Sequence, residues 1–164
     1  MEIPNYDSSG DPDKKKYKQL FPYMPSDTFR MLICGNSGSG KTNLLYHMLI
    51  KPLLYFDEIY LYARNLEQDK YKQLMQKMRE LRRHKNCSVI YLSQSFYKTP
   101  KDIRLNCSHY CLYEFPSSRE SNRISSELGV DKETYKAATR KPFTFLYVDK
   151  PRKRIAKNFT GNLA

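Results

Sequence analysis

Apolar runs of strand length alternate along the chain with segments of helical spacing. The runs occupy residues 28–34, 58–63, 87–92, 110–115 and 142–148. The intervening segments predict helices over residues 42–51, 66–83, 117–128 and 131–139, and a short helical turn over 100–105. Because strands and helices alternate, the pattern predicts an α/β fold with a mostly parallel sheet flanked by helices.

Some helix ends carry their own signals. Pro52 ends the first helix, because proline has no N–H group to continue the hydrogen-bond pattern. Gly129 is expected to end the helix over residues 117–128. Asp131 is expected to cap the helix that follows.

The polar ends of the chain set its domain boundaries. The chain has 164 residues, enough for about one domain at roughly 100 to 200 residues each. Residues 1–20 are polar and carry a lysine run, which predicts a loose basic N-terminal arm. Residues 150–164 begin with Lys-Pro-Arg-Lys-Arg and predict a basic C-terminal tail. One α/β domain is therefore expected over residues 21–149.

The chain is strongly basic. Its 29 lysines and arginines against 17 acidic residues give a formal net charge of +12, while 14 tyrosines and 8 phenylalanines exclude a disordered basic tail. Such a protein attracts polyanions, so double-stranded DNA held through its phosphates is the first partner to consider. The basic clusters lie at residues 14–18, 79–85 and 150–157. For a single cluster a solvated surface is the favoured interpretation, and the last cluster is also consistent with a nuclear localisation signal.

No membrane segment or secretion signal is recognisable. The longest apolar run, residues 143–148, is far shorter than the roughly 18 residues of a membrane-spanning helix, and residues 1–17 are polar. We therefore expect a soluble, intracellular protein. Cysteines stay reduced in that compartment, and the chain has Cys34, Cys87, Cys107 and Cys111. The last two are four residues apart, but no second pair completes a tetrahedral zinc site.

One segment matches a motif with a known chemistry. Residues 35–42 fit the phosphate-loop pattern G-x-x-x-x-G-K-[S/T] at every fixed position. The segment follows a predicted strand and precedes a predicted helix, so its backbone N–H groups can converge on phosphate oxygens. The candidate nucleotide-binding residues are Gly35, Asn36, Ser37, Gly38, Ser39, Gly40, Lys41 and Thr42.

The side chains of this motif have separate roles. Glycine leaves room for the wrapped backbone. Lys41 is expected to reach the β- and γ-phosphates, and the Thr42 hydroxyl to bind Mg²⁺. The expected cofactors are therefore ATP and Mg²⁺.

A second stretch carries a family resemblance. Residues 84–107 read His-Lys-Asn-Cys-Ser-Val-Ile-Tyr-Leu-Ser-Gln-Ser-Phe-Tyr-Lys-Thr-Pro-Lys-Asp-Ile-Arg-Leu-Asn-Cys. With the phosphate-loop motif, this stretch closely resembles the poxvirus-type DNA-packaging ATPases of the FtsK–HerA superfamily, found in large DNA viruses, virophages and Polinton-like elements. The resemblance covers most of residues 20–148. It implies a P-loop NTPase fold of the ASCE type.

The resemblance also implies roles for single residues. Lys41 and Thr42 match the Walker A lysine and the Mg²⁺ ligand. Gln94 matches the glutamine that senses the γ-phosphate or positions water, since an amide can donate to phosphate and accept from water. Arg83, with Arg82 in place of the family's glycine, matches an arginine that acts on a neighbour's nucleotide; an exposed cation at a helix end is an equal alternative.

Arg104 and Asn106 match the family's Ile-Arg-Leu-Asn element, for which a structural role is at least as good an interpretation as a catalytic one. For the whole protein, the resemblance implies a viral ATPase hydrolase of virion assembly that couples ATP hydrolysis to DNA packaging. It implies a homo-oligomeric ring on double-stranded DNA, with capsid or portal components as partners. The implied location is the cytoplasm or nucleus of an infected cell, or the virion.

The chain departs from the family in one region. The Walker B element, an apolar strand ending in two acidic residues, is missing, because residues 72–80 run directly into Leu-Arg-Arg-His. Asp57 and Glu58 follow an apolar stretch, but at a position where the family has an ordinary strand edge, which favours a surface turn. Without that carboxylate, nucleotide binding can outlast hydrolysis. The alternatives are a hydrolysis-defective nucleotide- or DNA-binding remnant and, with less support, a small-molecule kinase.

Overall fold

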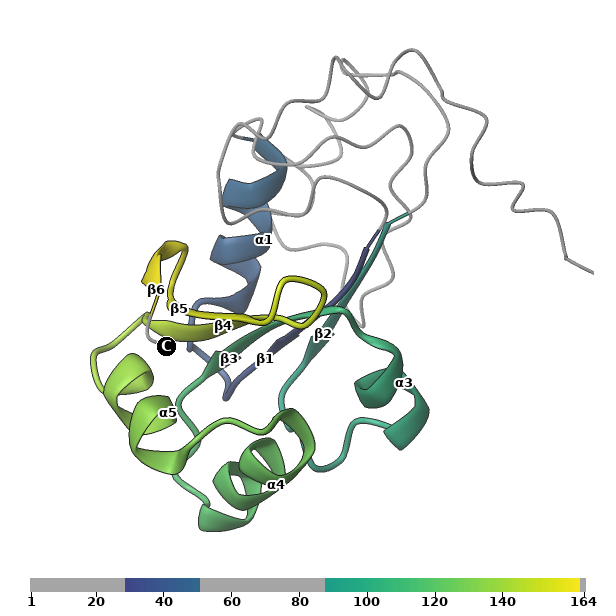
Figure 1. Ribbon diagram of the computed structural model, residues 1–164. Coiled ribbons are helices and arrows are strands. Elements are labelled where there is room, and N and C mark those ends of the chain that lie inside the picture. Colours follow the sequence, from purple (N-terminus) through teal and green to yellow (C-terminus); the bar gives the residue numbers. More distant parts are fainter. Residues whose placement is uncertain (1–28, 51–87, 163–164) are drawn as a thin grey trace, which may run out of the picture.

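A computed structural model describes residues 29–50 and 88–162 of the chain (Figure 1). Its helices and strands are β1 Arg30–Cys34, α1 Lys41–Ile50, β2 Val89–Ser93, α3 Lys101–Asn106, β3 His109–Tyr113, α4 Ser118–Leu128, α5 Lys132–Thr139, β4 Phe145–Asp149, β5 Arg154–Lys157 and β6 Thr160–Asn162. The predicted arm over residues 1–20, the strand over 58–63, the helix over 66–83 and Cys87 lie outside the described residues.

The predicted elements within the described part are confirmed, with shifted ends. Asp131 caps α5 as predicted, because its carboxylate accepts hydrogen bonds from the N–H groups of Glu133 and Thr134, each at 3.0 Å. Gly129 ends α4 with φ of 66°. The strand predicted from residue 142 begins only at Phe145, because Phe143 has a left-handed φ of 61° that interrupts an extended backbone.

The described strands form one mixed sheet in the order β2-β1-β3-β4-β5-β6. β1 pairs in parallel with β2 and with β3, whereas the pairs β3–β4, β4–β5 and β5–β6 are antiparallel. The parallel half agrees with the predicted sheet, and the antiparallel half differs from it. The reason is that β3 and β4 are joined by a pair of helices, α4 and α5, which returns the chain to the end of the sheet where β3 finished.

The C-terminal segment is part of the sheet. Residues 150–164 were expected to form a basic tail, but the structure places residues 154–157 in β5 and 160–162 in β6. In β5, Ala156 is buried against the sheet and pairs with Tyr147 of β4. The basic run at residues 150–154 is therefore the turn between two strands and the start of the second.

Helices cover both faces of the sheet, with α1 on one face and α3, α4 and α5 on the other (Figure 1). Neighbouring strand residues alternate between two cores, since Met31 and Ile33 pack with Met48 of α1, whereas Leu32 packs with Ile124 of α4. This double cover explains why β1, β3 and β4 are almost entirely apolar. No helix within the described residues is long and apolar enough to cross a membrane.

Candidate nucleotide site

Residues 35–42, called the glycine loop below, connect β1 to α1. The loop is held at both ends by backbone hydrogen bonds: Gly35 N donates to Ser93 O at the end of β2 (3.2 Å), and Leu44 N donates to Gly40 O in the first turn of α1 (2.9 Å). The loop therefore lies beyond the carboxyl ends of two neighbouring parallel strands and opens directly into a helix. In α/β proteins this is where ligands bind.

Glycine is required at defined points of the loop. Gly38 and Gly40 have φ of 77° and 99°, values that other residues rarely adopt. At Gly35, a Cβ atom would come within 2.6 Å of Tyr113 Cβ and 2.8 Å of Ser39 Oγ. These glycines allow the backbone to wrap closely, which exposes successive N–H groups along the inner side of such a loop.

Lys41 folds back over the loop. Its Nζ atom donates to Gly35 O and to Asn36 O, each at 2.7 Å. Partial burial lowers the pKa of Lys41 below its ordinary value. The ammonium group is thus held at the loop by neutral carbonyl oxygens, and a bound phosphate would provide a stronger, anionic partner.

Two hydroxyl groups complete the loop. Ser39 Oγ is buried and has no hydrogen-bond partner within the described residues, an uncommon state for a hydroxyl group. Thr42 lies half-buried in the first turn of α1. The wrapped glycine backbone, the ammonium of Lys41 and the hydroxyl of Thr42 together fit a triphosphate with Mg²⁺, whose preferred ligands are oxygen atoms.

Gln94 lies next to this loop. It directly follows β2, whose last residue, Ser93, pairs with Cys34 immediately before the loop. Gln94 is exposed and lines a cavity of about 330 Å³, together with Ser93, Ser95 and Lys98. The structure therefore brings Gln94 and the glycine loop to the same edge of the sheet.

The segment that carries Gln94 is fixed by hydroxyl groups. Thr99 Oγ1 lies 2.8 Å from Ser93 Oγ and 2.7 Å from Ser95 O, so its single proton can bond to either acceptor. Ser93 Oγ donates to Ser95 O at 3.0 Å. These bonds close residues 93–99 into a compact turn in which Gln94 has a defined backbone position.

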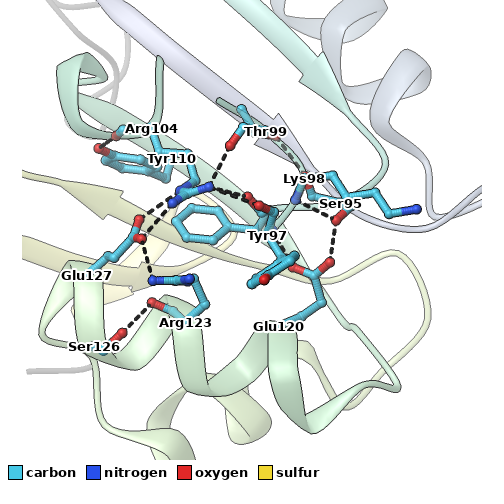
Figure 2. A network of polar contacts seen from close by, with 11 residues as sticks. Ser95, Tyr97, Lys98, Thr99, Arg104, Tyr110, Glu120, Arg123, Ser126 and Glu127 are labelled. Atoms are coloured by element: carbon cyan, nitrogen blue, oxygen red, sulfur yellow. Dashed lines mark hydrogen bonds and ion pairs between the residues drawn. The ribbon is translucent and has the colours of Figure 1, made fainter. Parts of the chain in front are cut away.

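Two buried charged side chains anchor the same turn from behind (Figure 2). Both oxygens of Glu120, in α4, are engaged: Ser95 Oγ donates to one at 2.5 Å and Tyr97 N to the other at 2.7 Å. Arg104 Nη1, in α3, donates to the carbonyl oxygens of Tyr97 and Thr99. Sequence analysis missed Glu120, because nothing in the sequence indicates that a glutamate in the first turn of a helix faces a distant loop.

Two arginines of α4 pack against the ring of Tyr97, which belongs to the same turn. The guanidinium carbons of Arg119 and Arg123 lie 4.5 Å and 5.2 Å from the ring centroid. Such cation–π contacts hold both positive charges close together at the surface. Sequence reasoning did not single out these two arginines, although their separation of four residues in α4 places them on one face of the helix.

The remaining predicted residues fall elsewhere. Arg82, Arg83, Asp57 and Glu58 lie outside the described residues. No group of His, Cys, Asp and Glu able to hold a metal ion occurs in the described part of the chain. The thiol of Cys34, directly before the loop, is buried, and burial raises its pKa to about 12, so it stays protonated at neutral pH.

Solved viral structures share this fold. The genome packaging NTPase B204 from Sulfolobus turreted icosahedral virus 2, in complex with ATP-gammaS, matches with a TM-score of 0.53 and 15% identity over 79% of this chain and 96% of that chain. Its complex with AMPPCP matches with a TM-score of 0.53 and 16% identity over 82% and 98%. The DNA-packaging ATPase B204 from Sulfolobus turreted icosahedral virus matches with a TM-score of 0.52 and 14% identity over 80% and 97%.

No protein-family model and no curated protein matches the chain. At identities of 14–16%, the similarity to the B204 structures concerns the fold. The chain has the P-loop NTPase fold, with the glycine loop at the edge of the sheet where this fold places its phosphate-binding segment.

Proposed function

We propose that this protein binds Mg-ATP at the glycine loop and is a viral genome-packaging ATPase of the FtsK–HerA type. The observation that carries the proposal is the wrapped loop between β1 and α1. The ammonium group of Lys41 folds back over this loop, and Gln94 follows the end of the adjacent strand. The packaging role is supported by the fold shared with B204, which was solved with ATP analogues. Double-stranded DNA as partner and a ring of identical subunits belong to the same proposal.

Different groups of the chain bind the phosphates, the Mg²⁺ ion and the attacking water. Backbone N–H groups of the loop and the first turn of α1 surround the phosphates, and Lys41 moves from the carbonyl oxygens of Gly35 and Asn36 to the phosphate oxygens. Mg²⁺ would be held by the Thr42 hydroxyl and would neutralise phosphate charge. Gln94, on its fixed turn, orients water or the γ-phosphate.

The experiment is isothermal titration of Mg-ATP into the full chain and into the Lys41→Ala variant. Losing a charged hydrogen-bond donor to phosphate should weaken binding at least about 10-fold. Lys136→Ala is the matched control, because Lys136 is an exposed lysine of α5 paired with Glu133 at 3.0 Å. Equal ATP affinity of the wild type and Lys41→Ala would refute the proposed site.

Proton linkage provides a second readout for the same site. Only the charged form of Lys41 attracts phosphate, and burial lowers its pKa in the free protein. ATP affinity should therefore hold at neutral pH and decline as the pH rises through that lowered pKa. Lys41→Ala should remove this decline.

A hydrolysis-defective relative is the second candidate function. The favouring observation is that Glu120, a buried carboxylate of α4 that contacts the turn after Gln94, has both oxygens engaged by Ser95 and Tyr97. It is not free to polarise water. Steady-state phosphate release distinguishes the two candidates: the defective protein binds ATP but turns it over near background, and Lys41-dependent turnover would exclude it.

If turnover depends on Lys41, the catalytic carboxylate must be located. An Asp57→Asn, Glu58→Gln double variant tests whether those two residues supply it. Loss of turnover with ATP affinity retained would assign them the role. Unchanged turnover would remove them from consideration.

A further inference from the structure

Phe143 is an aromatic side chain in an unusual position. Its side chain is 70% exposed, the highest value among the exposed large hydrophobic residues of the described chain. Its backbone has φ of 61°, in the left-handed region that a bulky residue rarely occupies. Exposure and backbone conformation are both unfavourable for phenylalanine, so packing among the described residues does not explain why phenylalanine stands here.

The surrounding structure holds this conformation from both sides. On one side, Thr144 donates from N and from Oγ1 to Lys141 O, at 3.2 Å and 2.6 Å. On the other, Phe145 N donates to Asn158 Oδ1 at 3.0 Å, and Asn158 N donates back to Phe145 O at 2.9 Å. Backbone conformations imposed in this way are concentrated at ligand-binding sites.

The ring lies against the glycine loop. A Cβ atom placed on Gly40 would come within 3.2 Å of Phe143 Cδ1, so the two residues are in direct proximity. Figure 1 shows the start of β4 beside the first turn of α1, where the loop ends. An exposed aromatic face therefore borders the segment proposed to hold the phosphates.

Phe143 and Gln94 lie on opposite sides of β1 in the sheet order. Gln94 follows β2 on one side of β1, whereas Phe143 precedes β4 on the other side, beyond β3. A nucleotide with its phosphates in the loop and its γ-phosphate toward Gln94 would extend its base toward β4. The ring is then within reach of the base rather than of the triphosphate.

We propose that Phe143 is a base-stacking residue, which binds the purine or pyrimidine ring of the nucleotide held at the glycine loop. The inference rests on the proposed function and adds a second point of recognition to it. Stacking on an aromatic ring contributes affinity without reading the hydrogen-bonding edge of the base. Phe143 therefore does not discriminate between the bases of ATP, GTP and CTP.

Two ligands separate base stacking from phosphate binding: Mg-ATP and magnesium tripolyphosphate, which has no base. Phe143→Gly removes the ring and suits the left-handed backbone, and Phe143→Tyr keeps the ring. Removing the ring should weaken ATP binding about 5- to 100-fold and leave tripolyphosphate binding unchanged. Phe143→Tyr should bind both ligands like the wild type.

Leu105→Ala is the matched control, since Leu105 is an exposed apolar residue, 48% accessible, on α3. It should change neither affinity. Thermal unfolding of each variant, followed by circular dichroism, checks that the fold is retained.

The other outcomes overturn the inference in distinguishable ways. If Phe143→Gly weakens ATP and tripolyphosphate equally, the ring supports the loop and not the base. If it changes neither affinity but lowers the sedimentation coefficient, the ring is a contact between subunits. If the wild type binds neither ligand, the proposed nucleotide site itself is refuted, and base stacking with it.

Discussion

Arg104 illustrates how a single buried residue can position a site without touching a ligand. Its Nε and Nη2 atoms donate to the two oxygens of Glu127 at 2.8 Å and 2.7 Å, and its Nη1 atom donates to carbonyl oxygens of the turn that follows Gln94. Its guanidinium carbon lies 5.4 Å from the centroid of the Phe96 ring. The sequence left a structural and a catalytic role open for Arg104, and these contacts support the structural role.

At the residue scale we predict that Arg104→Leu lowers the free energy of unfolding by about 3 to 5 kcal/mol. The substitution removes the two short hydrogen bonds to the Glu127 carboxylate, which keeps only its longer contact to Arg123 among the described residues, and it removes the Arg104 donor from three carbonyl oxygens. Chemical denaturation measures the change. Arg123→Leu is the control, because Arg123 contacts the same carboxylate at 3.5 Å with a side chain that is 41% accessible, and its loss should cost less than about 1 kcal/mol. Equal losses of stability for the two variants would contradict the prediction.

At the scale of elements, the helix pair α4–α5 determines the direction of the second half of the sheet. α4 ends at Gly129, whose N–H donates to Ser125 O at 3.0 Å, and α5 begins after the Asp131 cap. The short connection folds α5 back, so β4 starts at the edge where the glycine loop lies. α4 also carries Glu120, which accepts hydrogen bonds from the turn over residues 93–99 (the Gln94 turn), and Glu127, which holds Arg104 against that turn.

We predict that Gly129→Ala destabilises the protein by about 1 to 2 kcal/mol, the cost of a left-handed conformation for a residue with a Cβ atom. Apart from Gly129 and its two chain neighbours, no described residue has an atom within 4 Å of the Cβ position at Gly129, so the effect would be conformational rather than steric. Gly129→Asn should lose less, since asparagine adopts this conformation more readily. Urea unfolding of the three proteins provides the comparison. An alanine variant as stable as the wild type would show that the helix end tolerates another backbone conformation.

At the scale of the whole molecule, positive charge gathers at opposite ends of the sheet. Lys153, in the turn between β4 and β5, and Arg154, the first residue of β5, are both exposed. Arg119 and Arg123 cover Tyr97 beside the Gln94 turn. Because β4 is antiparallel to β3, its turn with β5 lies at the end of the sheet away from the glycine loop. Side chains at that turn can therefore be altered without changing the candidate nucleotide site.

We predict weak binding of duplex DNA without sequence preference, with affinity that falls steeply as salt is raised. Exchanging both Lys153 and Arg154 for glutamate should reduce the slope of log affinity against log salt by about 2, one for each phosphate that the variant no longer neutralises. Fluorescence anisotropy at increasing salt measures this slope. Lys136→Ala, at a lysine already paired with Glu133, should change it less. Salt-independent binding, or strong preference for one sequence, would refute the prediction.

The sequence by itself determined the local features of this protein. The glycine loop, the strand before it, the Gly129 helix end and the Asp131 cap each depend on residues a few positions apart, so their physical causes are visible in a short stretch of sequence. Gln94 was indicated only by the family resemblance of residues 84–107, and the parallel pairing of β1 with β2 brings it to the edge of the sheet where the glycine loop lies.

Only the tertiary structure decided features that depend on distant partners. Residues 154–157 were predicted to belong to a tail, because the basic residues there can be seen in the sequence. Their pairing with β4 depends on the direction in which that strand runs, which the sequence does not reveal. Glu120 and Arg104 became anchors of the Gln94 turn only when α3 and α4 packed against it. Phe143 was predicted to be part of an apolar strand. Its place beside Gly40 depends on the hydrogen bonds between Phe145 and Asn158, which lies thirteen residues further along the chain than Phe145. Long-range packing selects such contacts from many that the sequence permits, and the candidate site depends on them.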